Sequence, residues 1–389
     1  MRAQRREDRR ARDAQLPQHV PRRETREDVR RTPLYDEHVT AGARLVPFAG
    51  FEMPVAYAGI LREHDAVRHR AGLFDLSHMG QFYLTGDRVA EWADTLTINA
   101  VGTMKPLQAR YNVFCNEAGG AHDDTIFYRL DGRWLLVVNA ANADKMWSHL
   151  NAHKPSGVAL ANEHGRRALI AIQGPLSVEI LQPHVDVDLA SMRYYFAAEG
   201  RAGGFPAVIA RTGYTGEDGF ELFVDGGYAP KLWRELLRAG ASAGLEACGL
   251  GARDVLRLEA GMPLYGHELT EEITPVQAGL SWALKLAKPE FIGRAALAAQ
   301  RDRDDYSRIV GLVMEGRVPA REGYPVLLDG RRVGEIRSGS IAPSAGNRNV
   351  ATALVAPEAA TDGTALAVTI RGASHAARVV PLPFYKRAK

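Results

Sequence analysis

The chain has 389 residues, of which 46% are hydrophobic and 24% are charged, the composition of a soluble globular protein with material for two or three domains. No apolar run approaches the roughly 18 residues that cross a bilayer, which excludes a membrane protein. The net charge of +3 is unevenly spread, because residues 1–31 hold eleven arginines and six acids, a charge of +5, which leaves −2 on the rest. The main body therefore gives little electrostatic reason to expect nucleic-acid binding.

Residues 1–31, the arginine-rich tail, contain no serine and no apolar segment. A secretory signal needs an apolar segment, and a mitochondrial presequence is rich in serine and poor in acids. We therefore predict a disordered tail, with a polyanion-binding arm as the alternative.

The two cysteines, Cys115 and Cys248, lie far apart and neither has a C-x-x-C neighbour. This spacing argues against a disulfide framework or a cysteine zinc site and favours a reducing, cytoplasmic compartment. No H-E-x-x-H motif occurs, and His149 and His153, four residues apart, lack a third ligand nearby. We therefore expect no metal site.

From residue 32 to 305 the chain alternates between helix-like and strand-like segments. Strands are expected at 72–86, 111–116, 124–130, 133–140, 207–211 and 220–225, and helices at 60–72, 87–96, 229–240, 249–261 and 294–305. From residue 306 to 389 the sequence becomes rich in short strands punctuated by turns, which indicates a small β-barrel. The pattern predicts an α+β fold followed by an all-β domain.

Two adjacent acids, Asp123 and Asp124, stand where the strand at 124–130 begins. Successive side chains of a strand face opposite sides, so Asp124 shares the more apolar face with Ile126 and Tyr128, and Asp123 shares the mixed, wetter face with Arg129. A carboxylate in an apolar row is partly desolvated, which raises its pKa and suits it to moving a proton or stabilising a cation. The alternative is an aspartate that caps the turn by accepting backbone N–H bonds.

Two further segments carry charge in patterns that suit a ligand site. The glycine-punctuated stretch "RTGYTGEDGFELF" (211–223) bears Glu217, Asp218 and Glu221, and its glycines allow close approach to a flat or anionic ligand; a hairpin with polar tips is the alternative. In "GLGARDVLRLEAG", Arg253 and Arg257 are four apart and share a helix face. One arginine can clamp a carboxylate while an acid neutralises the other; ordinary surface salt bridges are the alternative.

Nine segments, in order along the chain, resemble the aminomethyltransferase (T-protein) family of the glycine cleavage system. They run from residue 32 to about residue 386 and leave only the tail uncovered: "TPLYDEHVTAGARLVPFAGFEMPV", "EHDAVRHRAGLFDLSHMG", "NEAGGAHDDTIFY", "LLVVNAAN", "ALIAIQGP", "RTGYTGEDGFEL", "GLGARDVLRLEAGMPLYGHEL", "TPVQAGLSW" and "PFY". One such segment is a weak signal, but nine in order are a strong one.

The resemblance implies a three-domain cloverleaf around a central folate-binding site, with a small β-barrel as the third domain. We accordingly expect a tail at 1–31, two interleaved α+β domains at 32–305 and the barrel at 306–389. The implied reaction takes the aminomethyl group from the lipoyl arm of H-protein, releases ammonia and gives 5,10-methylenetetrahydrofolate. The expected partners are lipoylated H-protein and tetrahydrofolate, with no nucleic acid and no membrane.

The family's catalytic aspartate is the second acid of the pair, which falls on Asp124. The resemblance implies that its carboxylate sits near folate N5 and N10, orients the folate, and either stabilises an iminium-like cation or removes a proton. Glu221 and Arg253 resemble the acid on the pterin side and its arginine neighbour. The residues expected to line the pocket are Tyr111, Asn139, Tyr195, Tyr265 and Met79.

The sequence departs from the family pattern in three places. Phe51 replaces the usual tryptophan of "F-A-G-W-E-M-P", Ala121 and His122 replace two aliphatic residues before the acid pair, and the arginine-rich tail has no counterpart. Three alternatives share the fold: a tetrahydrofolate-dependent demethylase, a non-catalytic folate-binding protein, and the folate half of a flavin dehydrogenase. The second is marked by "K-G-C-Y-x-G-Q-E" and the third by an N-terminal G-x-G-x-x-G domain, and neither pattern occurs here.

Overall fold

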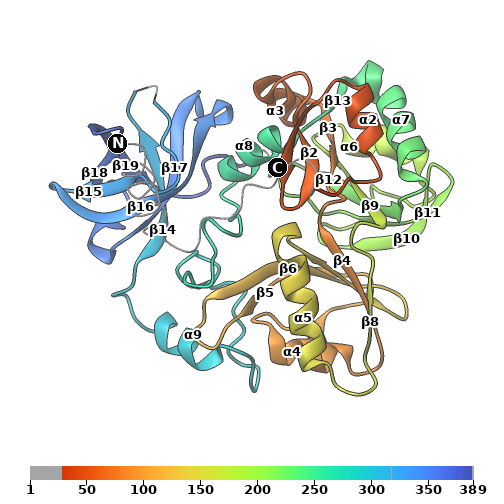
Figure 1. The fold of residues 1–389 in the computed structure, drawn as a ribbon, viewed down its shortest axis with the longest axis horizontal. Coiled ribbons are helices and arrows are strands. Elements are labelled where there is room, and N and C mark those ends of the chain that lie inside the picture. The colour runs from red at the N-terminus through yellow and green to blue at the C-terminus, as the bar shows by residue number, and fades with distance from the viewer. Residues whose placement is uncertain (1–28, 317, 388–389) are drawn as a thin grey trace, which may run out of the picture.

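A computed structural model describes residues 29–316 and 318–387, and residues 1–28 of the arginine-rich tail lie outside it. Three lobes surround helix α8 (Leu250–Glu259): a six-stranded sheet with its helices, a five-stranded sheet with its helices, and a barrel (Figure 1). The arrangement confirms the predicted α+β fold and the barrel at the C-terminal end.

The six-stranded sheet is mostly antiparallel and has the order β10-β11-β12-β9-β3-β13. Its central strands are apolar on both faces because helices cover one face and a second sheet covers the other. Ile170, Leu222 and Trp233 lie in the core beneath the helices. The elements are α2 (Tyr35–Thr40), α3 (Ile60–His69), β3 (Ala71–Asp75), β9 (Arg167–Gln173), α6 (Ser177–Leu181), β10 (Ala197–Ala202), β11 (Phe205–Ala210), β12 (Gly219–Asp225), α7 (Ala229–Gly240) and β13 (Leu245–Ala247).

The five-stranded sheet has the order β5-β6-β7-β4-β8 and is antiparallel throughout. Helices α4 and α5 cover one face, where Trp92 and Met146 pack against Phe127 and Leu136. The elements are β4 (Gly80–Thr85), α4 (Val89–Leu96), β5 (Ala109–Cys115), β6 (Ala121–Arg129), β7 (Trp134–Val138), α5 (Ala143–His153) and β8 (Ala159–Asn162).

The two sheets are interleaved in sequence. The segment 72–86, expected as one strand, forms β3 and β4, and the chain turns between them so that each joins a different sheet. A shared cluster then packs the sheets together, with Phe74 and Phe223 from the six-stranded sheet and Tyr128 and Val137 from the five-stranded one. The prediction of one strand was wrong because an apolar alternation does not say which partner each half pairs with.

The barrel has the order β14-β17-β16-β15-β18-β19 and closes because β19 pairs with β14. Closure leaves no free edge, and the inward row of small and branched side chains fills the interior. Its strands are β14 (Arg308–Met314), β15 (Pro325–Leu328), β16 (Arg331–Ala342), β17 (Arg348–Val355), β18 (Ala365–Ile370) and β19 (Ala373–Val380). Helix α9 (Arg294–Arg301) precedes it, and the hairpin of β1 (Arg44–Phe48) and β2 (Phe51–Ala56) lies near the start of the chain.

Helix α8 links the barrel to the six-stranded lobe through buried polar contacts. The Arg257 guanidinium donates to the Ser338 hydroxyl at 2.8 Å on the barrel side, and the Glu259 carboxylate pairs with Arg68 of α3 at 2.8 Å. The chain end returns to this junction, where the Tyr385 amide donates to the Glu259 carbonyl and its ring lies 4.0 Å from the Arg68 guanidinium. These contacts fix α8 at the meeting point of the lobes.

Candidate active site

The acid pair lies on β6, with Asp123 opposite Phe114 and Asp124 opposite Val113 on β5. Asp123 is fully buried, whereas Asp124 is partly exposed. The expectation that Asp123 faces the wetter side was therefore wrong. Its face of the sheet is the one that α4 and α5 cover, and Asp124 points instead toward the other sheet.

The two acids have different partners. Asp123 Oδ1 accepts from Asn139 Nδ2 at 2.9 Å and from Asn142 Nδ2 at 2.7 Å. Its Oδ2 accepts from the backbone N–H of Asn139 at 3.2 Å. Asp124 Oδ1 accepts from Asn139 Nδ2 at 2.7 Å and Oδ2 from the Tyr111 hydroxyl at 3.1 Å. The structure therefore brings together three of the predicted residues, namely Asp124, Tyr111 and Asn139.

Burial dominates the electrostatics of the acid pair. It raises the pKa of Asp124 to about 6, against the hydrogen bonds from Asn139 and Tyr111, which lower it. Burial and the neighbouring charge of Asp124 raise the pKa of Asp123 to about 7. The desolvation predicted for Asp124 is present, and it places the titration of this carboxylate close to neutral pH.

Glu221 faces the same region from β12. Its Oε2 accepts from the Thr212 hydroxyl and from the Tyr128 hydroxyl at 3.1 Å, and only 7% of the residue is exposed. Burial lowers the pKa of Arg253, and the Glu221 charge raises it. The Arg253 guanidinium stacks 4.7 Å from the Tyr214 ring and has no hydrogen-bond partner within the part of the chain that the structure describes. Glu221 is thus a buried carboxylate, and Arg253 keeps its guanidinium donors free of hydrogen-bond partners among the described residues.

The two arginines of α8 differ in their partners. Arg257 is 2% exposed and is neutralised internally by Glu268 at 3.0 Å and Asp254 at 2.8 Å. Arg253, one turn earlier, has no such ion pair among the described residues. Surface salt bridges do not describe this helix face.

Tyr195 and Met79 form the apolar side of the region. Both pack on the cluster that joins the two sheets. Burial raises the pKa of Tyr195 above its ordinary value, and the charges of Glu221 and Asp124 raise it further, so the ring lies within electrostatic range of both acids. Its backbone has φ +61°, in the left-handed region that few residues other than glycine adopt. An aromatic residue held in a strained backbone conformation on this cluster suits a ligand wall.

Tyr265 packs on the cluster that also contains Tyr111 of β5, and the charge of Asp123 acts on it. Its hydroxyl accepts from Lys145 Nζ at 2.9 Å, and the same ammonium reaches Glu271 at 3.0 Å. His122 Nδ1 also contacts Glu271, at 3.2 Å. His122, one of the departures from the family pattern, therefore contacts the Lys145–Glu271 ion pair, while Phe51, another departure, is fully buried.

Sequence reasoning missed several residues at the site. Tyr128 and Thr212 hold Glu221, and Lys145 holds Tyr265. Trp282, 60% exposed, lies with its ring centroid 5.8 Å from that of Tyr111. Thr212 lies in the same 211–223 segment as Glu221, whereas Tyr128, Lys145 and Trp282 come from segments far along the chain from their partners, so no local pattern links them.

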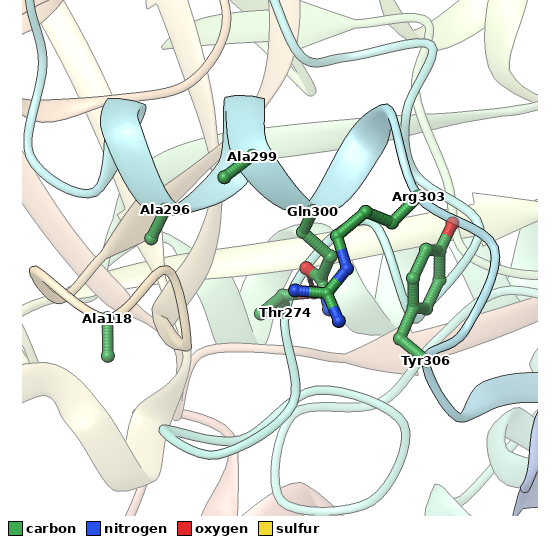
Figure 2. Close-up of a pocket in the computed structure, with 7 residues that line it drawn as sticks. All are labelled: Ala118, Thr274, Ala296, Ala299, Gln300, Arg303 and Tyr306. Atoms are coloured by element: carbon green, nitrogen blue, oxygen red, sulfur yellow. Dashed lines mark hydrogen bonds between the residues drawn. The ribbon is translucent and has the colours of Figure 1, made fainter.

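A separate pocket of about 260 Å³ lies on the outer side of the turn between β5 and β6, against α9 (Figure 2). Three of its polar side chains have partners, since Thr274 donates to Gln300 at 2.6 Å and Arg303 pairs with Asp305. None of the predicted site residues lines it. The lining residues are Ala118, Thr274, Ala296, Ala299, Gln300, Arg303 and Tyr306.

Three further observations bear on the predictions from composition. Both cysteines are free and buried. No group of three or more histidine, cysteine or acidic residues suited to a metal ion occurs in the ranges 29–316 and 318–387. Within those same ranges, no helix has the length and apolar character needed to cross a membrane.

Comparison with known proteins identifies the family. The GCVT N-terminal domain matches residues 34–288, and the glycine cleavage T-protein C-terminal barrel domain matches residues 308–386. The aminomethyltransferase of Rubrobacter xylanophilus is 49% identical over 363 residues, which cover 93% of this chain and 95% of that protein. The aminomethyltransferase of Streptomyces coelicolor is 47% identical over 369 residues, covering 93% and 99%.

A solved structure agrees with these sequence matches. The crystal structure of the glycine cleavage system aminomethyltransferase T from Bartonella henselae matches with a TM-score of 0.86 and 34% identity, covering 92% of this chain and 98% of that one. Both domains of the family, and nearly the whole length of its members, are therefore present. The chain belongs to the aminomethyltransferase (T-protein) family of the glycine cleavage system.

Proposed function

We propose that this protein transfers the methylene of an aminomethyl group from the lipoyl arm of an H-protein to tetrahydrofolate. The products are ammonia, dihydrolipoyl H-protein and 5,10-methylenetetrahydrofolate. The observation that carries the proposal is the partly exposed, desolvated Asp124, held by Tyr111 and Asn139 at the family's catalytic position. The relatives named aminomethyltransferase support the same reaction.

The residues present suit a folate. A pterin ring has a flat surface and a donor edge formed by its 2-amino group and N3, which calls for a carboxylate and an apolar or aromatic wall. Glu221 supplies a buried carboxylate, and Tyr195 and Met79 supply the wall. Arg253 retains guanidinium donors beside them. We assign the pterin to this side of the site.

Asp124 supplies the negative charge that the reaction needs. The methylene carbon becomes positively charged when its bond to nitrogen breaks, and a carboxylate in a desolvated site stabilises such a cation more than it would in water. With a pKa raised by burial to about 6, Asp124 is mostly ionised at neutral pH. The same group is basic enough to take a proton from a folate nitrogen during attack on the carbon.

Asn139 and Tyr111 orient this carboxylate. Asn139 is rigidly placed, because its side chain donates to both acids and to the Asp124 carbonyl at 3.0 Å. Each oxygen of Asp124 therefore has one fixed donor. A carboxylate held in this way needs little reorganisation when charge develops in front of it.

The test is a balanced product assay. Full-length protein is incubated with aminomethylated H-protein and tetrahydrofolate, and ammonia and 5,10-methylenetetrahydrofolate are measured together. We expect equal release of both, dependent on the protein and on the lipoyl group. Folate binding without either product would contradict aminomethyl transfer, and the related demethylases would then be tested with small sulfonium and methylamine donors.

A further inference from the structure

The reaction proposed above requires a proton donor as well as a carboxylate. The bond between the methylene carbon and the amine breaks readily only if the nitrogen leaves as ammonia, since an amide anion is far too basic to depart. Asp124 and Asp123 are the acids at hand, but Asp124 acts in its ionised form. Asp123 is fully buried, and all of its hydrogen bonds in the described structure come from N–H donors. Asp123 also faces the side of the sheet that α4 and α5 cover, opposite to Asp124, so it is not placed to protonate a group in front of Asp124.

Lys145 and Tyr265 form a donor pair beside the acid pair. Lys145 stands in the first turn of α5, three residues after Asn142, which binds Asp123. Its Nζ donates to the Tyr265 hydroxyl at 2.9 Å and to Glu271 at 3.0 Å. Glu271 thus balances the charge of the Lys145 ammonium without accepting the hydroxyl hydrogen of Tyr265.

The Tyr265 hydroxyl has a hydrogen to give. Its oxygen accepts from the ammonium, so its own hydrogen must point elsewhere. No acceptor for that hydrogen exists among the described residues. Tyr265 packs on the same apolar cluster as Tyr111, whose hydroxyl binds Asp124. The free donor therefore belongs to the same cluster as Tyr111, the residue that binds the proposed catalytic carboxylate.

The protonation states of Tyr265 and Lys145 suit proton donation. Burial raises the pKa of Tyr265 above its ordinary value, so the hydroxyl keeps its proton at neutral pH, while Lys145 opposes this rise by stabilising the phenolate. The hydrogen bonds to Tyr265 and Glu271 raise the pKa of Lys145 against the effect of its burial. The charged groups that act on Tyr265 are Lys145, Glu271 and Asp123.

The geometry points to Tyr265 as the catalytic acid that protonates the departing amine. Lys145 positions the Tyr265 hydroxyl and returns a proton to it after the transfer. The Tyr265 proton passes to the amine nitrogen, the C–N electron pair leaves with ammonia, and the carbon remains as a sulfur-stabilised cation facing Asp124. Lys145 returns a proton to the phenolate. A folate nitrogen then attacks the carbon, and the proton it loses restores Lys145 through solvent. When the second folate nitrogen displaces sulfur, its proton goes to the thiolate.

The first test replaces Tyr265 by phenylalanine in the full-length protein. We expect Tyr265→Phe to lower kcat about 100-fold, the scale of general-acid catalysis, with the KM for tetrahydrofolate changed less than about threefold. The matched control is Tyr228→Phe, which removes a hydroxyl from a residue that is 42% exposed on the far lobe and stacked on Phe205. Wild-type kcat in Tyr265→Phe would overturn the assignment, as would a loss confined to KM.

The pH dependence separates a proton donor from a structural residue. At lower pH the substrate amine carries its own proton, so the wild-type enzyme loses its advantage over Tyr265→Phe. We expect the ratio of the two kcat values to shrink between pH 8 and pH 6, and protonation of Asp124 affects both enzymes alike. A ratio that does not change with pH would overturn the role of Tyr265 as an acid.

The role of Lys145 is tested by substitutions that remove or keep its positive charge. Lys145→Met is expected to lower kcat about tenfold, and Lys145→Arg to keep it within about threefold of wild type, because an arginine retains a cationic donor. Lys231→Met, which removes an exposed lysine from α7, is the control. Equal kcat losses in Lys145→Met and Lys145→Arg would contradict the positioning role.

This inference rests on the proposed function, and the assay distinguishes the two. If wild-type protein releases ammonia and methylenetetrahydrofolate but Tyr265→Phe does so equally fast, only the assignment of the acid fails. If wild-type protein releases neither product, the proposed function fails and the acid assignment fails with it.

Discussion

Two neighbouring aspartates on one strand have different environments because they face opposite sides of a sheet. The alternation of side chains, read from the sequence, correctly separated Asp123 from Asp124 and indicated a desolvated Asp124. It assigned the wetter face wrongly, since the helices that cover Asp123 come from segments before and after the strand. Local pattern gives the relation between two residues of a strand, but the burial of each depends on distant partners.

Asp123 should make stability depend on pH. Its pKa in the folded protein, raised by burial and by Asp124 to about 7, exceeds its ordinary value near 4, so the folded state binds more protons than the unfolded state. The contribution of this group to stability is therefore lost as pH rises from about 4 to 7. We expect the free energy of unfolding in urea to fall with pH over this window less in Asp123→Asn than in wild type. Equal slopes would show that this carboxyl is not perturbed.

Tyr111 should set the pH below which kcat falls. Its hydroxyl donates to Asp124 and lowers the pKa of that carboxyl, against burial, which raises it. We expect kcat of the wild type to fall below about pH 6, as Asp124 is protonated. In Tyr111→Phe the lost hydrogen bond raises the pKa of Asp124, so the fall begins at higher pH. A profile of kcat against pH checks this, and an unchanged limb would mean that another group controls it.

At the scale of the element, helix α8 carries two arginines on one face that have different partners. Its sequence predicted that Arg253 and Arg257 share a face and divide the work of binding and internal neutralisation. The spacing alone does not say which arginine is neutralised internally, and only the family resemblance pointed to Arg253 as the ligand contact. The reason is that Glu268, the partner of Arg257, lies beyond the helix and is itself held by Thr352 of the barrel. The spacing fixes which residues are adjacent, and the tertiary contacts decide their roles.

The two arginines should respond differently to truncation. Arg257→Ala leaves Glu268 buried without its cation, and we expect a loss of about 3–5 kcal/mol in the free energy of unfolding. Arg253→Ala breaks no ion pair and is expected to change stability by about 1 kcal/mol or less, while raising the KM for tetrahydrofolate. Urea denaturation and steady-state kinetics on both variants measure the difference. A reversed pattern would contradict the division of roles.

At the scale of the whole molecule, three lobes meet around α8, and the candidate site takes its residues from the two sheet lobes and from α8 (Figure 1). The barrel was predictable because its strands are short and regularly punctuated by turns, so local pattern carries the information. The interleaved sheets were harder to predict, since a single apolar stretch supplies β3 to one sheet and β4 to the other. The candidate site was found through the family's motifs, because Asp124, Glu221 and Arg253 are far apart in sequence and have no shared local signal.

The most direct test of the central claim is the turnover of Asp124→Asn with aminomethylated H-protein and tetrahydrofolate, measured together with its Kd for tetrahydrofolate. Asparagine keeps the size of the side chain but cannot stabilise a cation or accept a proton as the carboxylate does. We expect kcat to fall by about 100-fold or more, with the Kd within about threefold of wild type. Turnover like that of the wild type would contradict a catalytic role for this carboxylate.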